Sequence, residues 1–165
     1  IDYQNKYKEG YFITIYLAPT DYHRIHCPWD GEIIHSNHLG SSLYSVNKKA
    51  QESIPRLYIK NERSVMHIVS NSLEYALVSV GASVVGSIVP FWIDNKDCSR
   101  KELVEKWKVG PPKGTKVKKG DELAHFRMGS TVILILKDSD KIDLDSLKEN
   151  KLVKFGNKLV SLKNI

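Results

Sequence analysis

Alternating apolar and polar residues recur along the chain and predict short strands. The segments "YFITIYL" (11–17) and "GEIIHS" (31–36) combine β-branched or aromatic residues with this alternation. Residues 56–70 predict two short strands separated by the polar residues 61–63, and residues 74–88 are rich in valine, isoleucine and glycine, as in buried strands. The pattern favours a mostly β, antiparallel fold with a few short helices (α+β).

One helix has a clear start and a clear end. Ser99 followed by Glu102 forms a capping-box pattern, and the Gly-Pro-Pro run at 110–112 ends the helical pattern. The apolar side of this helix comprises Leu103, Val104 and Trp107.

The second half of the chain returns to strands. Residues 113–126 predict a β-hairpin with glycines at its turns, and "STVILIL" (130–136) predicts a further strand. Residues 143–151 indicate a loop or one helical turn, and residues 151–162 indicate two short strands around a glycine.

Length and charge narrow the class of protein. The 165 residues predict one domain (1–165), and no apolar run reaches the roughly 20 residues that span a membrane as a helix. The net charge of +6 favours an acidic partner, either nucleic acid or an anionic lipid surface. No nucleic-acid-reading motif accompanies it, so nucleic acid is not expected. The lysine cluster at 113–119 is the candidate contact with anionic lipid.

The two cysteines, Cys27 and Cys98, do not make a disulfide framework. Cys27 lies beside His26, so a reactive thiol is one interpretation. The chain begins with Ile1 and carries no signal-peptide pattern, so an N-terminal part of the gene product is expected outside it.

His23 and His26 are three residues apart. In a helical turn this spacing would put both rings on one face, as a proton-transfer pair, a metal half-site or two surface histidines. His35, His38 and Cys27 lie nearby, but their spacings match no strong metal motif. No metal is expected, and a histidine-based metal-binding module remains an alternative.

The Gly129-Ser130 step can carry chemistry at the backbone. A serine after a glycine can turn its hydroxyl onto the preceding carbonyl, because glycine has no side chain in the way and tolerates unusual dihedral angles. If a histidine removes the hydroxyl proton, the peptide can rearrange to an ester. Elimination and hydrolysis would then leave an N-terminal pyruvoyl group. Most Gly-Ser pairs are simply turns.

Four segments together resemble the phosphatidylserine decarboxylases, a family of pyruvoyl-dependent enzymes that cleave their own precursor. The segments are "YLAPTDYHRIHCPWDG" (16–31), "NERSV" (61–65), "VGASVVGSI" (80–88) and "KKGDELAHFRMGSTVILIL" (118–136). The resemblance implies decarboxylation of phosphatidylserine to phosphatidylethanolamine through a Schiff base with the pyruvoyl group. Such an enzyme is a carboxy-lyase.

By position, the resemblance implies cleavage between Gly129 and Ser130. Residues 1–129 would form the β chain and 130–165 the α chain, with Ser130 converted to the pyruvoyl cofactor. His26 matches the base of self-cleavage and His23 the acid of decarboxylation. Thr131 is a candidate for positioning the cofactor.

The family also places an orienting aspartate well upstream of these histidines, where this chain has no residues. Asp21 and Asp30 do not match that position. Either that aspartate lies in the N-terminal part expected outside this chain, or the base lacks its orienting partner. In the second case cleavage would be slow or absent. The resemblance implies phosphatidylserine and an anionic membrane surface as partners, at a bacterial inner membrane or a mitochondrial inner membrane, with a homodimer as an open alternative.

A second hypothesis is a non-enzymatic domain like the biotinyl or lipoyl carriers. The Gly-Asp-x-Leu hairpin in "VKKGDELAHFRMGS" (117–130) is similar to those domains and suggests related architecture. Carriers need a lysine at the hairpin tip, and here residues 128–130 are Met-Gly-Ser.

Overall fold

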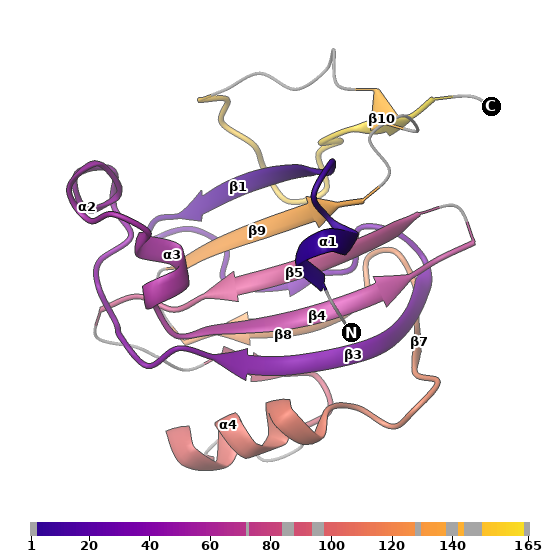
Figure 1. Cartoon of the computed structure of the whole chain (residues 1–165), viewed down its shortest axis with the longest axis horizontal. Helices are drawn as coiled ribbons and strands as arrows, with labels where there is room; N and C mark the ends of the chain where they lie inside the picture. The colour runs from indigo at the N-terminus through magenta and orange to yellow at the C-terminus, as the bar shows by residue number, and fades with distance from the viewer. Residues whose placement is uncertain are drawn as a thin grey trace.

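The computed structural model describes residues 3–71, 73–83, 88–93, 98–127, 130–137, 142–143 and 150–163. Its larger sheet has six strands in the order β1-β9-β5-β4-β3-β7, and every neighbouring pair is antiparallel (Figure 1). The strands are β1 (Tyr11–Leu17), β3 (Gly31–Leu39), β4 (Arg63–Val69), β5 (Glu74–Val80), β7 (Lys116–Val117) and β9 (Ser130–Leu136).

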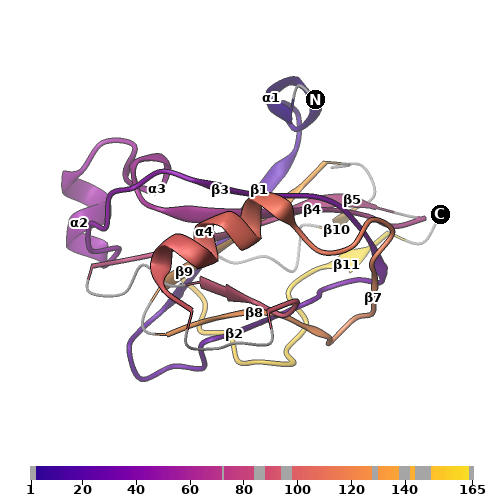
Figure 2. The same cartoon turned by 90° about the horizontal axis from the view of Figure 1, so that it is seen from below.

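Two smaller sheets complete the β structure. One has the order β2-β8-β6, with β2 (Arg24–His26), β8 (Glu122–Phe126) and β6 (Ile88–Pro90). The other pairs β10 (Ile142–Asp143) with β11 (Ser161–Leu162). Figure 2 shows β2 and β8 as a second layer on one side of the larger sheet, while α1 (Tyr3–Lys6) lies on the opposite side.

The main core lies between the larger sheet and the β2-β8-β6 sheet. Successive strand residues point to opposite faces, so every second residue of the larger sheet faces this core. The buried side chains that meet there include Ile25, Met66, Ile68, Tyr75, Leu77, Leu123, Phe126, Val132, Leu134 and Leu136. We call this side of the larger sheet the inner face.

The outer face carries a smaller apolar cluster. Val78 and Val80 of β5 pack there with Val46, Leu57 and Ala82. Two short helices, α2 (Lys48–Ser53) and α3 (Leu57–Lys60), cover this end of the outer face (Figure 1). The sequence pattern did not predict α1, α2 or α3, because each has only four to six residues.

The predicted helix is confirmed as α4 (Arg100–Val109). Ser99 and Glu102 form both hydrogen bonds of the capping box, and Gly110 follows the last helical residue with φ 76°, which favours glycine. Leu103 and Trp107 are buried, and the Trp107 indole nitrogen donates to the backbone oxygen of Ile88 at 2.8 Å. This bond ties α4 to β6.

The predicted fold class, mostly antiparallel β with short helices, is confirmed, but three local predictions are wrong. Residues 57–60 form α3 and not a strand, so only the second strand of 56–70 exists. The 113–126 hairpin does not form, because β7 pairs with β3 while β8 pairs with β2 and β6. Within 151–162 only Ser161–Leu162 is a strand.

The two histidines do not lie in a helical turn. Arg24–His26 is strand β2, so His23 and His26 do not share one face of a helix. Most of the expected loop at 143–151 lies outside the described residues. Among the described residues, no helix is both long and apolar enough to cross a bilayer.

Candidate active site

A tight turn carries the chain from β1 to β2. The Asp21 carboxylate accepts from the Ala18 amide at 2.8 Å, and the Asp21 amide donates to the Ala18 carbonyl at 2.9 Å. This reciprocal pair closes the turn, because an aspartate side chain can replace a backbone acceptor. The turn fixes the backbone just before His23.

His23 has one ring nitrogen engaged and the other without a partner. Nδ1 lies 2.5 Å from the backbone oxygen of Asp21, and since a carbonyl only accepts, Nδ1 carries the ring hydrogen. In the neutral ring Nε2 then bears the lone pair. Nε2 is buried and has no hydrogen-bond partner among the described residues. His23 therefore offers a sheltered nitrogen that can take up a proton.

His26 has both ring nitrogens engaged. Nδ1 lies 2.7 Å from the Gly120 carbonyl and must donate to it, so Nε2 accepts from the Tyr22 hydroxyl, also at 2.7 Å. The ring stacks on Tyr22 with centroids 5.7 Å apart, and the Phe155 ring centroid lies 4.4 Å away. To act as a base on another group, Nε2 must first part from the Tyr22 hydroxyl.

Ser130 is the first residue of β9 and is fully buried. Its Cα partner is Leu17, and it shares the inner face with Val132, which packs in the main core. Thr131 points to the outer face, where its Cα partner Val80 packs. Neither hydroxyl oxygen has a hydrogen-bond partner in the part of the chain that is described.

The crossing from the small sheet to the larger one lies beside His23. The Phe126 amide at the end of β8 donates to the His23 carbonyl at 2.9 Å, and β9 begins four positions later at Ser130. His26 pairs with Glu122 at the other end of β8. At ~3.3 Å per strand residue, His26 lies roughly 10 Å farther along this strand pair than His23. Gly129, the other half of the predicted cleavage step, lies outside the described residues.

Known proteins identify the family. The family model of phosphatidylserine decarboxylase matches residues 1–161. The chain belongs to the phosphatidylserine decarboxylase family. The resemblance predicted from the four sequence segments is therefore confirmed.

Individual family members show how much of the chain is shared. A phosphatidylserine decarboxylase proenzyme of Methylobacillus flagellatus is 36% identical over 137 residues, which is 83% of this chain and 49% of the relative. The proenzyme of Hamiltonella defensa is 39% identical over 149 residues, 88% of this chain and 51% of the relative. That of Vibrio parahaemolyticus is 39% identical over 148 residues, with the same two shares, 88% and 51%. The chain thus spans about half the length of these curated relatives.

The neighbouring cysteine does not behave as a reactive thiol. The Cys27 sulfur is buried, 3.0 Å from the Trp29 carbonyl and 3.2 Å from the Tyr75 hydroxyl. Burial raises the pKa of the Cys27 thiol, which disfavours the nucleophilic thiolate. Within the described ranges, no three His, Cys, Asp or Glu side chains gather as metal ligands would. The contacts of the Cys27 sulfur argue against the thiol interpretation.

A buried ion cluster lies between β3, β4 and α4, at the end of the "NER" segment. The Glu62 carboxylate accepts from Nε of Arg100 at 2.6 Å and lies 3.3 Å from Nε2 of His38. Burial alone would raise the pKa of Glu62, but hydrogen bonds from His38 and Arg100 outweigh it and hold this pKa below its ordinary value. The cluster fastens α4 to the larger sheet. Because its charges are paired, a structural role fits it best.

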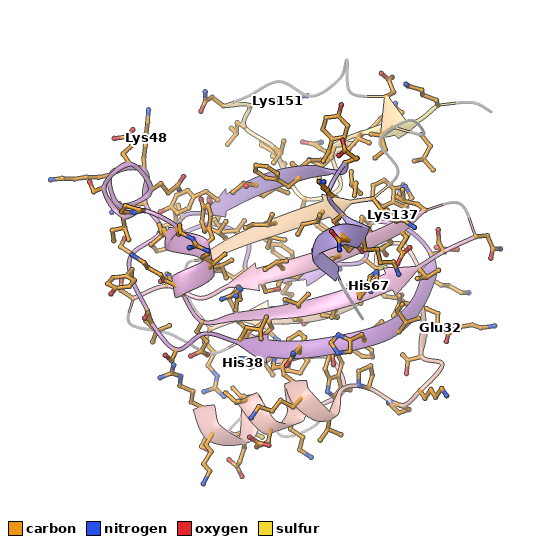
Figure 3. The ribbon with its side chains drawn as sticks, viewed as in Figure 1. Glu32, His38, Lys48, His67, Lys137 and Lys151 are labelled. Carbon is orange, nitrogen blue, oxygen red and sulfur yellow. The ribbon has the colours of Figure 1, made fainter. Side chains whose placement is uncertain are left out.

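A second ion cluster lies on the outer face, under α1. Lys6 and Lys137 both pair with the Glu74 carboxylate, and Nε2 of His67 lies 2.7 Å from it (Figure 3). Burial lowers the pKa of His67 to about 4, and the positive charge of Lys6 adds to this effect, while Glu74 opposes it. His67 is therefore neutral at pH 7.

Two residues that contact His26 were not predicted from the sequence. Tyr22 stands four positions before His26 and supplies the hydroxyl that its Nε2 accepts. Phe155 lies far along the chain, yet its ring contacts both Tyr22 and His26, with centroids 5.0 and 4.4 Å away. Tyr22 could have been noticed in the sequence, because it lies in the same segment (16–31) as the two histidines. Nothing in the sequence pairs Phe155 with His26.

Proposed function

We propose that the protein decarboxylates phosphatidylserine to phosphatidylethanolamine, using a pyruvoyl group that it makes from Ser130. Family membership supports the substrate and the reaction type. The observation that carries the proposal is the state of Ser130, whose buried hydroxyl has no hydrogen-bond partner among the described residues, where the chain crosses past His23. A buried hydroxyl without a hydrogen bond is costly, so its retention suggests a chemical role.

Self-cleavage would use the chain's own side chains. The Ser130 hydroxyl would attack the carbonyl carbon of Gly129. The resemblance assigns removal of the hydroxyl proton to His26, which would have to leave Tyr22 and approach Ser130 from the other end of β8. Burial of Ser130 keeps bulk water away from the resulting ester, so elimination can precede hydrolysis. Nδ1 of His26 donates to the Gly120 carbonyl and not to a carboxylate.

Residues around Ser130 fit a pyruvoyl group. Conversion of Ser130 removes the buried hydroxyl that has no partner, which relieves the cost of burying it. When present, a pyruvoyl carbonyl supplies an electron sink for decarboxylation of a bound amine. His23 would hold a proton on its buried Nε2 and deliver it to the carbon that loses carbon dioxide. The Thr131 side chain points to the outer face, away from this group, so a positioning role for Thr131 stays a prediction.

The two products of cleavage would stay together. Strand β9, at the start of residues 130–165, lies between β1 and β5 in the larger sheet. Its ladders to both neighbours run along the strand, from Ser130 or Thr131 to Leu136. Cleavage before Ser130 removes the Ser130 amide but leaves the ladder positions from Thr131 to Leu136 in place. The β and α chains would therefore form one molecule, acting at a membrane surface because the substrate is a lipid.

The test is direct analysis of the full-length protein and of its Ser130→Ala variant. We expect two fragments on a denaturing gel, with the smaller starting at residue 130 and carrying a keto group by mass. We also expect carbon dioxide release from phosphatidylserine vesicles, which phenylhydrazine, a carbonyl reagent, abolishes. The Ser130→Ala variant should remain in one piece. A single intact chain in the unmodified protein, or a lipoyl or biotinyl adduct on a lysine, would contradict the proposal.

A further inference from the structure

The segment after β10 presents apolar side chains to solvent between lysines. Leu152 is 86% exposed and Phe155 is 63% exposed. Lys151, Lys154 and Lys158 flank them and are exposed as well (Lys151 is labelled in Figure 3). We call residues 151–158 the Phe155 turn. An exposed apolar pair within a run of lysines is unusual for a surface that meets only water.

The Phe155 turn is held in a defined shape. The Lys154 amide donates to the Asn157 side chain at 3.0 Å, and the Asn157 amide donates back to the Lys154 carbonyl at 2.9 Å. Gly156 has φ 82°, which suits the second central position of a tight turn. Phe155 at its tip rests on Tyr22, whose side chain is itself 46% exposed. Beyond the turn, Val160 is buried in the main core and anchors the segment.

We propose that the Phe155 turn is the surface by which this chain docks on an anionic bilayer. Leu152, Phe155 and Tyr22 would enter the boundary between headgroups and acyl chains, while the lysines contact lipid phosphates. Positive charge on both sides of the apolar tip complements a negatively charged surface. Because Phe155 contacts His26, docking would bring a lipid headgroup next to the histidines.

The lysine cluster at 113–119, predicted from the sequence as the lipid contact, lacks the apolar half of such a surface. Its apolar residue, Val117, is buried in strand β7. The cluster therefore offers charge without an anchor. It contains at least three lysines. Replacing three of them therefore gives a control with the same change in charge.

The experiment measures binding of the 165-residue chain with Ser130→Ala, which cannot cut itself, to vesicles in a flotation assay. The vesicles are phosphatidylcholine alone or phosphatidylcholine with about one-third phosphatidylglycerol by weight, an anionic lipid that is not the proposed substrate. Replacing Lys151, Lys154 and Lys158 with glutamine should weaken binding to the anionic vesicles about 100-fold. Leu152→Ser with Phe155→Ser should weaken it by a similar factor, roughly tenfold per side chain.

Two control variants separate location from composition. Replacing Lys113, Lys116 and Lys119 with glutamine removes the same charge and should change binding less than about threefold. Val109→Ser removes an 81% exposed side chain on α4 and should have no effect. Equal losses in the two lysine variants would overturn the proposal, as would absence of binding to anionic vesicles. Because these measurements need neither cleavage nor decarboxylation, their outcome is independent of the proposed function.

Discussion

The two faces of the larger sheet treat their polar groups differently. On the outer face the Glu74 carboxylate pairs with Lys6 and Lys137, which compensate its charge, and it lies beside neutral His67. On the inner face Ser130 is buried with a hydroxyl that has no partner among the described residues, and the buried Nε2 of His23 also lacks one. The outer cluster stabilises the fold. The inner groups cost stability and remain available for chemistry.

Buried polar groups differ in whether neighbouring groups compensate them. A compensated cluster explains its own presence, because removing one member leaves an unpaired charge. A buried group without a partner needs another reason to be there. The predictions below test this distinction in order of decreasing expected effect.

The largest effect is expected from removing the inner-face hydroxyl. Ser130→Ala should abolish self-cleavage completely, because alanine has no hydroxyl oxygen to attack the Gly129 carbonyl. The matched control is Ser79→Ala, since Ser79 is also a buried serine, and its Cα partner is Val132 of the same strand β9. Ser79→Ala should leave cleavage unchanged, as judged by fragment masses over time. Loss of cleavage in both variants would mean that packing, and not the hydroxyl, limits the reaction.

The two histidines should separate in their effects. We expect His26→Ala to stay in one piece, and His23→Ala to cut itself but to release carbon dioxide about 10²–10⁴-fold more slowly, because general acid catalysis contributes that much. Gel analysis and carbon dioxide release measure the two steps. The opposite result would make His23 the base of self-cleavage and His26 the acid of decarboxylation. It would mean that the free Nε2 of His23, and not the Tyr22-bound Nε2 of His26, meets Ser130.

On the outer face the expected effect is on stability and depends on pH. The pKa of His67 lies at about 4 in the folded protein against 6.5 for an unperturbed histidine, a difference worth about 3 kcal/mol. This stabilisation is fully present above pH 6.5 and is lost as the pH falls toward 4, because the unfolded chain binds the proton first. Urea denaturation between pH 7 and pH 4 should show the loss. His67→Gln should remove this part of the pH dependence without stopping cleavage at pH 7.

The sequence predicted most strands but misplaced several of their partners. β1, β3, β5 and β9 follow the apolar pattern, because each has one face in the main core. The pairing of β7 with β3 and of β8 with β2 is set by contacts between distant segments, which local pattern does not encode.

The candidate site was predicted from family resemblance more than from physical pattern. The Gly-Ser step and the two histidines carry only weak signals by themselves, and β2 is too short for its period to be read. The contact between Phe155 and His26 joins segments on either side of the proposed cleavage point. Only the folded chain reveals it.

Thr131 provides the smallest and most discriminating test of the two faces. Within the described part of the chain its buried hydroxyl has no hydrogen-bond partner, like that of Ser130, yet it points to the outer face beside Val80. Thr131→Val keeps the shape and removes the hydroxyl, so it should raise the free energy of unfolding by about 1 kcal/mol. If only hydroxyls on the inner face take part in the reaction, the rates of cleavage and decarboxylation should stay within about threefold. A positioned proton-transfer group typically contributes a factor of 10² or more. A larger loss of decarboxylation with normal cleavage would assign Thr131 to cofactor positioning and extend the reactive site to both faces of β9.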